Sequence, residues 1–335
     1  MSRMAFHFAG GDAFFAGLLL ILAAVLGSIS GGKRRFIKVR TLSALLGAVV
    51  IAFSATPLPD WAYIVSGIAV FLWFYLFLRP ADPVPETSEI CPPESEEDDD
   101  DELPEDELFE ATVAEDYPPP ETPRALRLMS LAVAVNCFVA FAWEIPFRGT
   151  PLLGERQHSR IAVIGDSISA GLLGPEKETT WPRQFQERYH IPVINVSREG
   201  ATAASALKQA DLVNPDVTLV LVEIGGNDLL GSTTPAQFAT DLERLLATLD
   251  LKGRQIVMLE LPLPPLYNRF GQAQRELAHR YDVALISRRD FAEVLAAHDA
   301  TLDGLHLSEQ GHRLMAEMIW RHLGSNLTPD HRDQP

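Results

Sequence analysis

The sequence predicts a chain of two unlike parts, an α-helical transmembrane region followed by an α/β domain with a parallel β-sheet. Three observations lead to this prediction. Long uncharged stretches occupy the first 80 residues and return near residue 130, and a strongly acidic segment separates them. From about residue 155, short β-branched runs alternate with helical patterns, which is typical of a parallel sheet covered by helices on both faces.

The N-terminal region, residues 1–80, contains three uncharged stretches long enough to cross a bilayer, which takes about 20 helical residues. They predict transmembrane helices at about 13–30, 41–58 and 61–78. A cleaved signal peptide is the alternative for the first stretch. We expect a retained helix, because only Arg3 precedes the stretch and its basic cluster follows it.

A fourth transmembrane helix is expected at 124–147. Its uncharged part, residues 128–143, is shorter than the other three stretches. A helix that lies in the membrane interface or packs on the following domain is therefore the alternative. Aromatic residues lie near the ends of the apolar segments, as membrane interfaces favour, at Trp61, Trp73, Tyr75 and Trp143.

Charges between the apolar segments predict the orientation. Cytoplasmic loops carry an excess of basic residues, and the first loop holds Lys33, Arg34, Arg35, Lys38 and Arg40. We therefore expect this loop on the cytoplasmic side of an inner or plasma membrane. After four crossings, residues beyond about 148 lie outside the cytoplasm. If the fourth segment does not cross, the C-terminal domain is cytoplasmic instead.

Residues 81–123 account for the net charge of −17. They hold 18 of the 45 acidic residues, nine prolines and no Lys or Arg. Such a segment cannot bury enough apolar surface to offset the entropy of ordering, so we expect a disordered cytoplasmic linker. A spacer is favoured over a tail that binds partners or cations. The remaining charges balance at 28 basic to 27 acidic, which disfavours nucleic acid as a partner.

The α/β domain is expected at 155–325, followed by a tail at 326–335. Thr234, Pro235 and Gln237 mark a helix start, with a capping Thr and Pro at the first helical position. Buried strands are predicted at Ile161–Ile164, Val193–Val196, Val217–Ile224, Ile256–Leu261 and Val283–Ile286. Helices are predicted near 201–211, 235–249, 271–281, 290–298 and 309–323.

Candidate site residues follow the first and third strands, and sites in open α/β sheets lie at the carboxyl ends of strands. Ser167 in Gly165-Asp166-Ser167 follows the first strand, where the amides of the next helix face developing negative charge. Asp-Ser is also an ordinary helix cap. The third strand is followed by Gly225, Gly226, Asn227 and Asp228.

Each residue after the third strand has an expected use. The glycines allow the backbone to approach a ligand closely. Asn227 offers a neutral N–H donor for an oxyanion. Asp228 is expected to cap the turn or the following segment, and an ordinary turn is the alternative for all four residues.

Asp303 and His306 lie just before the last predicted helix. A His can take the proton of a Ser hydroxyl and return it to the leaving group, and a carboxylate fixes its tautomer. A spacing of three residues in a turn can present both groups to one site. A chance pair in a surface loop is the alternative.

The short motifs around Ser167, Asn227 and the Asp303–His306 pair occur together with Gly200 after the second strand. In this combination the sequence resembles the SGNH (GDSL-type) hydrolase family over roughly residues 158–325. The strings GDSISAGL, EIGGNDLL and DGLHLSEQGH are most similar to its bacterial thioesterase/lysophospholipase branch. This resemblance implies a flavodoxin-like domain with a five-stranded parallel sheet. It implies nothing about residues 1–157.

The resemblance also implies residue roles. Ser167 is the nucleophile, His306 is the general base and acid, and Asp303 orients His306. The backbone N–H groups of Ser167 and Gly200 and the side chain of Asn227 form the oxyanion hole.

The chain departs from the family pattern in two places. Arg198 and Glu199 precede Gly200, where this branch has small residues, and the Pro-rich segment 261–268 is expected to shape the acyl pocket differently. No metal or cofactor is expected, since zinc-binding motifs are absent from the sequence. Five other histidines are expected at the surface, namely His190, His279, His298, His312 and His322.

The function expected from these observations is a membrane-anchored serine esterase. Its substrates would be acyl lipids or lysophospholipids, thioesters, or O-acetyl groups on glycans. The first alternative is an SGNH-type O-acyltransferase that modifies envelope glycans. The second is a non-catalytic membrane scaffold whose acidic linker binds partners.

Overall fold

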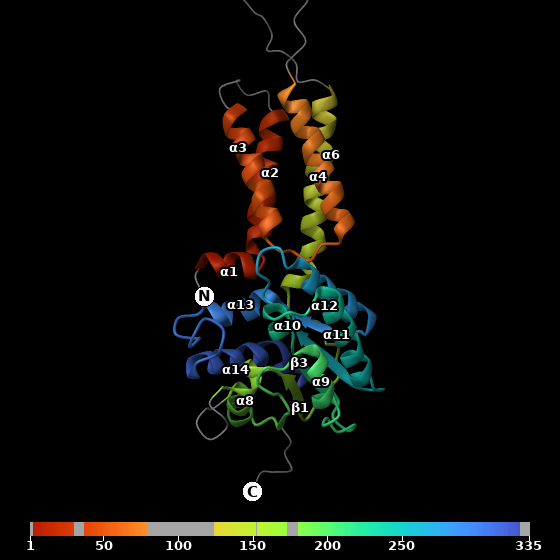
Figure 1. The fold of residues 1–335 in the computed structure, drawn as a ribbon, viewed down its shortest axis with the longest axis vertical. Coiled ribbons are helices and arrows are strands. Elements are labelled where there is room, and N and C mark those ends of the chain that lie inside the picture. Colours follow the sequence, from red (N-terminus) through yellow and green to blue (C-terminus); the bar gives the residue numbers. More distant parts are fainter. Residues whose placement is uncertain (1–2, 30–36, 80–123, 152, 173–179, 329–335) are drawn as a thin grey trace, which may run out of the picture.

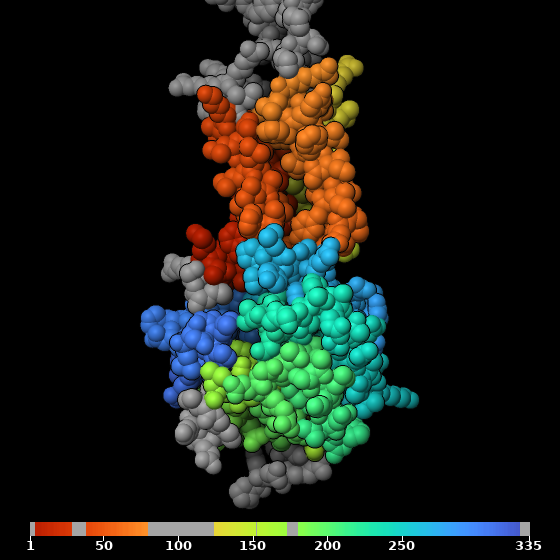
Figure 2. Space-filling model, in the orientation of Figure 1, coloured from red at the N-terminus to blue at the C-terminus, as the bar shows by residue number. Residues whose placement is uncertain are grey.

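The computed structural model describes residues 3–29, 37–79, 124–151, 153–172 and 180–328. A bundle of four long helices stands on an α/β domain (Figure 1), and the two parts form one continuous body in the space-filling view (Figure 2). The predicted linker at 81–123 and residues 329–335 of the predicted tail lie outside the described residues.

The bundle consists of antiparallel helices. A short helix, α1, precedes the first of them and lies across the end of the bundle that faces the domain (Figure 1). The second predicted span, 41–58, differs most from the structure, because its helix starts at Ile37 and ends at Phe53. Ala55 has a φ of 48°, and Pro57 and Pro59 cannot continue a helix. The bounds are α1 (Arg3–Ala9), α2 (Asp12–Ile29), α3 (Ile37–Phe53), α4 (Asp60–Leu78), α6 (Arg124–Glu144) and the 3₁₀ turn η2 (Ile145–Arg148).

Polar groups of the bundle bond to one another in its interior. Trp73 is fully buried, and its Nε1–H donates to Ser130 Oγ at 3.0 Å. Close approach of α2 and α3 depends on two glycines, because a Cβ at Gly17 would lie 2.8 Å from the Gly47 carbonyl oxygen. Two stretches among the described residues are long and apolar enough to cross a membrane, Asp60–Leu78 and Arg124–Arg148, and α2 is slightly shorter.

The domain is built on five parallel strands in the order β2-β1-β3-β4-β5, the flavodoxin-like order. This confirms the predicted five-stranded parallel sheet. In the register of β1 with β3, Gly165 lies beside Glu223, so the residues after these two strands meet at one edge. The bounds are β1 (Ile161–Gly165), β2 (Val193–Asn195), β3 (Leu219–Glu223), β4 (Gln255–Leu259) and β5 (Ala284–Ile286).

Alternate strand residues bury against helices on both faces of the sheet. Ala162 and Val220 pack with α9 (Ala203–Ala210), α11 (Pro235–Leu249) and α12 (Asn268–Arg280). Val163 and Leu221 pack with α8 (Trp181–Tyr189), α13 (Arg288–Ala296) and α14 (Glu309–Leu323). Three shorter elements complete the domain, namely α7 (Ser167–Ala170), α10 (Gly226–Leu230) and η3 (Gly324–Asn326).

Two sequence-based expectations fail in the domain. Helix α8 was not expected, because its apolar residues are few, yet Trp181 and Phe185 are fully buried. His312 and His322 were expected at the surface, but both are buried. His312 Nδ1 accepts a hydrogen bond from the Trp181 backbone N–H at 3.2 Å, so it joins α14 to α8.

Four buried charged residues, here called the latch, join the bundle to the domain: Glu144, Glu260, Arg275 and Arg288. Arg275 donates to both carboxylate oxygens of Glu144, at 2.7 and 2.9 Å, and to Glu260 at 2.6 Å. Arg288 donates to Glu144 at 3.3 Å and to the Ala55 carbonyl at 3.1 Å. The latch therefore ties the end of α6 and the α3–α4 connection to helices α12 and α13.

Candidate active site

Ser167 stands at the junction of β1 and α7. The backbone turns sharply there, and a Cβ at Gly165 would lie 2.7 Å from Ser169 Oγ, so only glycine fits. Asp166 caps α7 by accepting from the Ile168 backbone N–H at 2.9 Å. Ser167 is the first residue of the helix and is 8% exposed, which places its hydroxyl at the helix N-terminus, where negative charge is favoured.

Asn227 lies beside Asp166, across the same edge of the sheet. Its Nδ2 donates to Asp166 Oδ2 at 3.0 Å and to the Ala201 carbonyl at 3.1 Å. Gly225 precedes α10 with a φ of 119°, and a Cβ there would lie 2.8 Å from Leu261 Cδ1. Gly226 is less constrained, since its Cβ would make one tight contact, 3.2 Å from Asp166 Oδ2.

The loop after β2 is held against the same group of residues. Asp228 Oδ2 accepts from the Ala203 backbone N–H at 2.8 Å, so it caps the start of α9. Gly200 has a φ of 71°, which favours glycine, and no atom lies within 4 Å of the Cβ position. Because Ala201 bonds to Asn227, the exposed Gly200 is placed next to it.

Asp303 and His306 form a hydrogen-bonded pair in the loop before α14. His306 Nδ1 lies 2.7 Å from Asp303 Oδ2, while Asp303 Oδ1 accepts from the backbone N–H groups of Leu305 and His306. The hydrogen bond from His306 holds the pKa of Asp303 well below its usual value. An ionised Asp303 favours the tautomer with the proton on Nδ1, which leaves Nε2 as the basic nitrogen.

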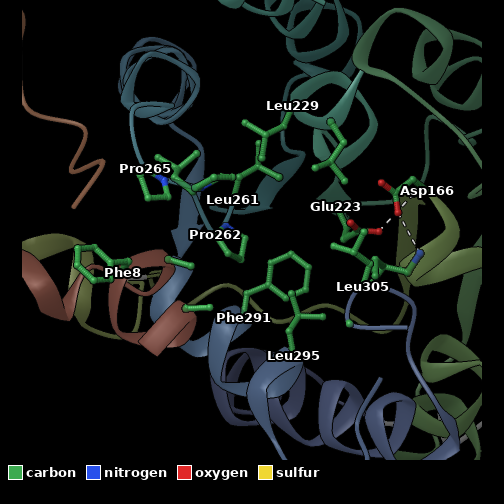
Figure 3. Close-up of a pocket in the computed structure, with 18 of the residues that line it drawn as sticks. Phe8, Asp166, Glu223, Leu229, Leu261, Pro262, Pro265, Phe291, Leu295 and Leu305 are labelled. Atoms are coloured by element: carbon green, nitrogen blue, oxygen red, sulfur yellow. Dashed lines mark hydrogen bonds between the residues drawn. The ribbon is translucent and has the colours of Figure 1, made fainter. Parts of the chain in front are cut away.

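The segments that follow β1 and β3 and the loop before α14 meet around one cavity of about 510 Å³. Its lining includes the neighbours of both Ser167 and His306, because Asp166, Ile168 and Leu305 all contribute (Figure 3). The structure therefore brings the segments that carry Ser167, Asn227 and the Asp303–His306 pair to one cavity, which their neighbours Ile168, Gly226 and Leu305 line.

Glu223 is the main site residue whose role the sequence motifs do not predict. It is 2% exposed, and its Oε2 accepts from the Asp166 backbone N–H at 3.3 Å and from Ser169 Oγ at 2.9 Å. We call Asp166 and Glu223 the carboxylate pair. The sequence does carry a signal for such a residue. Glu223 is the only acid in the apolar run at residues 219–224, which leads directly into Gly-Gly-Asn-Asp.

The carboxylate pair has no cation among the hydrogen-bond partners identified in the described residues. Burial raises the pKa of Asp166 to about 6. Burial and the nearby charge of Asp166 raise the pKa of Glu223 well above its usual value. The pair therefore keeps a proton over a wider pH range than exposed carboxyl groups do.

Further polar residues hold the turn that carries Ser167. Gln209 bonds to both the N–H and the carbonyl of Gly165, each at 3.0 Å. Trp181 Nε1–H donates to Ser169 Oγ at 3.1 Å, and Asn195 Nδ2 donates to the Ser169 carbonyl at 3.0 Å. These residues come from three different elements, so their convergence depends on the tertiary fold.

The arrangement suits acyl transfer through a serine. It combines a hydroxyl at a helix N-terminus, an Asp–His pair and an amide donor beside one cavity. Among the residues that the structure describes, no group of three or more His, Cys, Asp or Glu side chains could hold a metal ion.

Comparisons with known proteins agree with this chemistry. Residues 163–314 match the model of the GDSL-like lipase/acylhydrolase family. Esterase TesA of Pseudomonas aeruginosa is 29% identical over 174 residues, which cover 48% of this chain and 85% of that protein. Thioesterase 1/protease 1/lysophospholipase L1 of Escherichia coli K12 is 27% identical over 194 residues, covering 55% of this chain and 93% of that protein.

Among solved structures, the crystal structure of TesA is 28% identical, covers 49% of this chain and 97% of its own, and has a TM-score of 0.44. An arylesterase of Vibrio mimicus is 28% identical over 184 residues, which cover 50% of this chain and 90% of that protein. The match of residues 163–314 and these relatives make the C-terminal domain a member of the GDSL-like lipase/acylhydrolase family, and the chain is a serine hydrolase that acts on ester bonds.

Proposed function

We propose that this protein is a membrane-anchored esterase that hydrolyses carboxylic esters of acyl chains through an acyl-enzyme on Ser167. The observation that carries the proposal is the meeting of the Ser167 turn, Asn227 and the Asp303–His306 pair at one end of a cavity. Esters of acyl lipids and thioesters both present the carbonyl that this site would attack.

In the proposed reaction, Ser167 Oγ attacks the ester carbonyl while His306 Nε2 takes the hydroxyl proton. His306 then gives this proton to the leaving alcohol or thiol. A water molecule, deprotonated by the same nitrogen, then attacks the acyl carbonyl, and His306 returns that proton to Ser167 Oγ as the acid leaves. Asp303 keeps its bond to Nδ1 throughout, and so stabilises the imidazolium that forms in each step.

The negative charge on the attacked oxygen would be stabilised by backbone N–H groups of Ser167 and Gly200 and by Asn227. Both N–H bonds of Asn227 have acceptors in the structure, Asp166 and the Ala201 carbonyl. One of them must therefore turn to the oxyanion or be shared with it. The exchange favours the charged transition state over the neutral ester, as catalysis requires.

Anchoring in a membrane is supported by the outer surface of the bundle. Large apolar side chains of α4 and α6 are exposed over much of their length, while polar groups bond in the interior. Soluble monomers rarely expose contiguous apolar surface of this extent, and hydrogen bonds between helices are common inside membranes. Examples are Ile64, Ile68, Phe71, Leu128, Leu131, Val135 and Phe138, which are 53–69% exposed, with the extremes at Val135 and Leu128.

The proposed orientation places the catalytic domain outside the cytoplasm. Basic residues lie at the end of the bundle that is remote from the domain, where α3 begins, α4 ends and α6 begins (Figure 1). Positive charge favours the cytoplasmic side. These residues are Lys38, Arg40, Arg79, Arg124 and Arg127.

The catalytic proposal is tested with Ser167→Ala in the full chain, purified in detergent. We expect hydrolysis of p-nitrophenyl butyrate to fall by at least about 10³-fold, because no other nucleophile replaces the hydroxyl. Ser232→Ala, an exposed serine of the same domain, serves as the matched control and should retain wild-type activity. Substantial turnover by Ser167→Ala would refute the assignment.

The orientation is tested separately with reporter fusions at the C-terminus. A periplasmic reporter should be active and a cytoplasmic one inactive. The opposite result would place the domain in the cytoplasm and leave the catalytic proposal untouched.

A further inference from the structure

The cavity beside Ser167 extends beyond the family domain. At one end lie Asp166, Glu223 and Gly226, and at the other lie Met4 and Phe8 of helix α1. Figure 3 shows Phe8 and Asp166 on opposite sides of the cavity, with Pro262 and Phe291 between them. Helix α1 lies outside residues 163–314, so this wall comes from a part of the chain that the family model does not match.

The lining between the two ends is almost entirely apolar. The Pro-rich segment 261–265 forms one side, and Phe291 and Leu295 of α13 form another. The carboxylates that reach the cavity, Asp166 and Glu223, lie at the Ser167 end. An occupant should therefore have a polar group at that end and an extended apolar part directed toward α1.

The size of the cavity fits such an occupant. Its volume of about 510 Å³ lies within the range of about 300–1,000 Å³ that is usual for small-molecule sites. An acetyl group would leave most of this apolar space filled only by water. A long acyl chain would bury apolar surface along the whole length, at about 0.8 kcal/mol for each CH₂ group.

Helix α1 is held in place by contacts with the domain. It packs on α13 and ends at Ala9. Gly10 and Gly11 follow, and a Cβ at Gly11 would lie 2.5 Å from Arg288 Nη2. The next residue, Asp12, forms an ion pair with Arg289 of α13 at 3.3 Å. The wall at Phe8 is therefore a fixed part of the cavity, at the level where the bundle meets the domain (Figure 1).

We propose that α1 closes the far end of an acyl-chain cavity, so that the enzyme prefers esters of long acyl chains and Phe8 limits the chain length. This inference rests on the proposed esterase function. A membrane lysolipid and a soluble acyl thioester carry the same chain, and both would place it against Phe8.

The test uses the full chain in phosphatidylcholine vesicles and p-nitrophenyl esters from acetate to palmitate. Wild type should show kcat/KM rising with chain length. Phe8→Trp should lower kcat/KM for the longest accepted chains by about tenfold or more and leave acetate within twofold, since added bulk at a pocket end rejects only occupants that reach it. Phe8→Ala should move the optimum to longer chains.

Phe6→Trp is the matched control, because it makes the same change in α1 at a residue outside the cavity lining. It should keep the wild-type profile. The proposal is overturned if Phe8→Trp affects acetate and long chains equally, if it affects neither, or if Phe6→Trp shifts the profile in the same way.

Two further measurements identify the source of the acyl chain and show which proposal fails if the expected profile is not seen. Lysophosphatidylcholine in the vesicles and an acyl thioester of equal length in solution show from which phase the chain arrives, and the Phe8 effect is expected with both. If acetate hydrolysis depends on Ser167 but the chain-length profile is flat, the esterase function stands and the acyl-cavity inference fails. If hydrolysis does not depend on Ser167, the function itself fails.

Discussion

Two groups of buried carboxylates lie at the same edge of the sheet, and they differ in what neutralises them. In the latch, Glu144 and Glu260 face guanidinium groups, and Arg275 bonds to both of them. In the carboxylate pair, Asp166 and Glu223 face each other and neutral donors. Both groups are almost fully buried, so burial alone does not explain the difference.

The difference follows from the cost of burying charge. A carboxylate in a low-dielectric interior needs either a cation beside it or a proton. The latch supplies cations and so holds two parts of the chain together. The carboxylate pair takes the proton instead. Its lower charge lets it stay buried while Glu223 holds the Ser167 turn through hydrogen bonds from Asp166 and Ser169.

The largest expected effect comes from breaking the latch. Glu144→Ala leaves Arg275 and Arg288 buried without their shared carboxylate, and loss of one partner of a buried ion pair costs about 3–5 kcal/mol. We expect chemical unfolding of the full chain in detergent to show this loss. Glu144→Gln keeps an acceptor for Arg275 and should lose less. A loss below about 1 kcal/mol for Glu144→Ala would mean that the latch contributes little to stability.

A smaller and pH-dependent effect is expected from the carboxylate pair. The pKa of Asp166 is about 6 in the folded chain, against about 3.9 for an ordinary Asp. The folded state therefore binds more protons between about pH 4 and 6, and this pair loses stability as the pH rises through that window. The raised pKa of Glu223 acts in the same direction.

Glu223→Gln keeps hydrogen-bonding atoms at this position and removes one ionisable group. Measured as the free energy of unfolding at pH 5 and pH 8, the variant should gain stability relative to wild type at the higher pH, by an amount on the order of 1 kcal/mol. Equal differences at both pH values would show that the pair does not titrate in the folded chain. The comparison within each pH cancels the contributions of other groups.

The smallest effect is expected from an exposed ion pair. Arg183 and Glu187 lie one turn apart on α8 with their charged atoms 2.9 Å apart, and both side chains are more than half exposed. Solvent screens such pairs, so Arg183→Ala should change the unfolding free energy by less than about 0.5 kcal/mol. If Arg183→Ala lost as much unfolding free energy as Glu144→Ala, buried and exposed ion pairs would contribute equally to the stability of this protein.

Much of the domain could be predicted from local sequence. Helices α11 and α14 occupy the predicted residues, and none of the five strands extends more than one residue beyond its predicted range. Strong local signals explain this success. Thr234 does accept from the Gln237 backbone N–H, and runs of β-branched residues suit the interior of a parallel sheet.

The candidate site was also accessible from sequence, because each of its blocks is short. Ser167, Asn227 and the Asp303–His306 pair each follow a strand or precede a helix, and parallel strands bring such positions to one edge. The geometry of the Asp303–His306 pair is local, since a single turn contains it. Their catalytic roles remain predictions for the Ser167→Ala experiment.

What only the tertiary structure decided is which distant residues meet. Arg275 and Glu144 are 131 positions apart, Trp181 and His312 are also 131 apart, and Phe8 lines a cavity with Asp166. No local pattern encodes such contacts, because they depend on how helices from different parts of the chain pack. The sequence by itself determined the fold class and the candidate chemistry, while packing decided the proton-holding pair beneath Ser167, the latch and the far wall of the cavity.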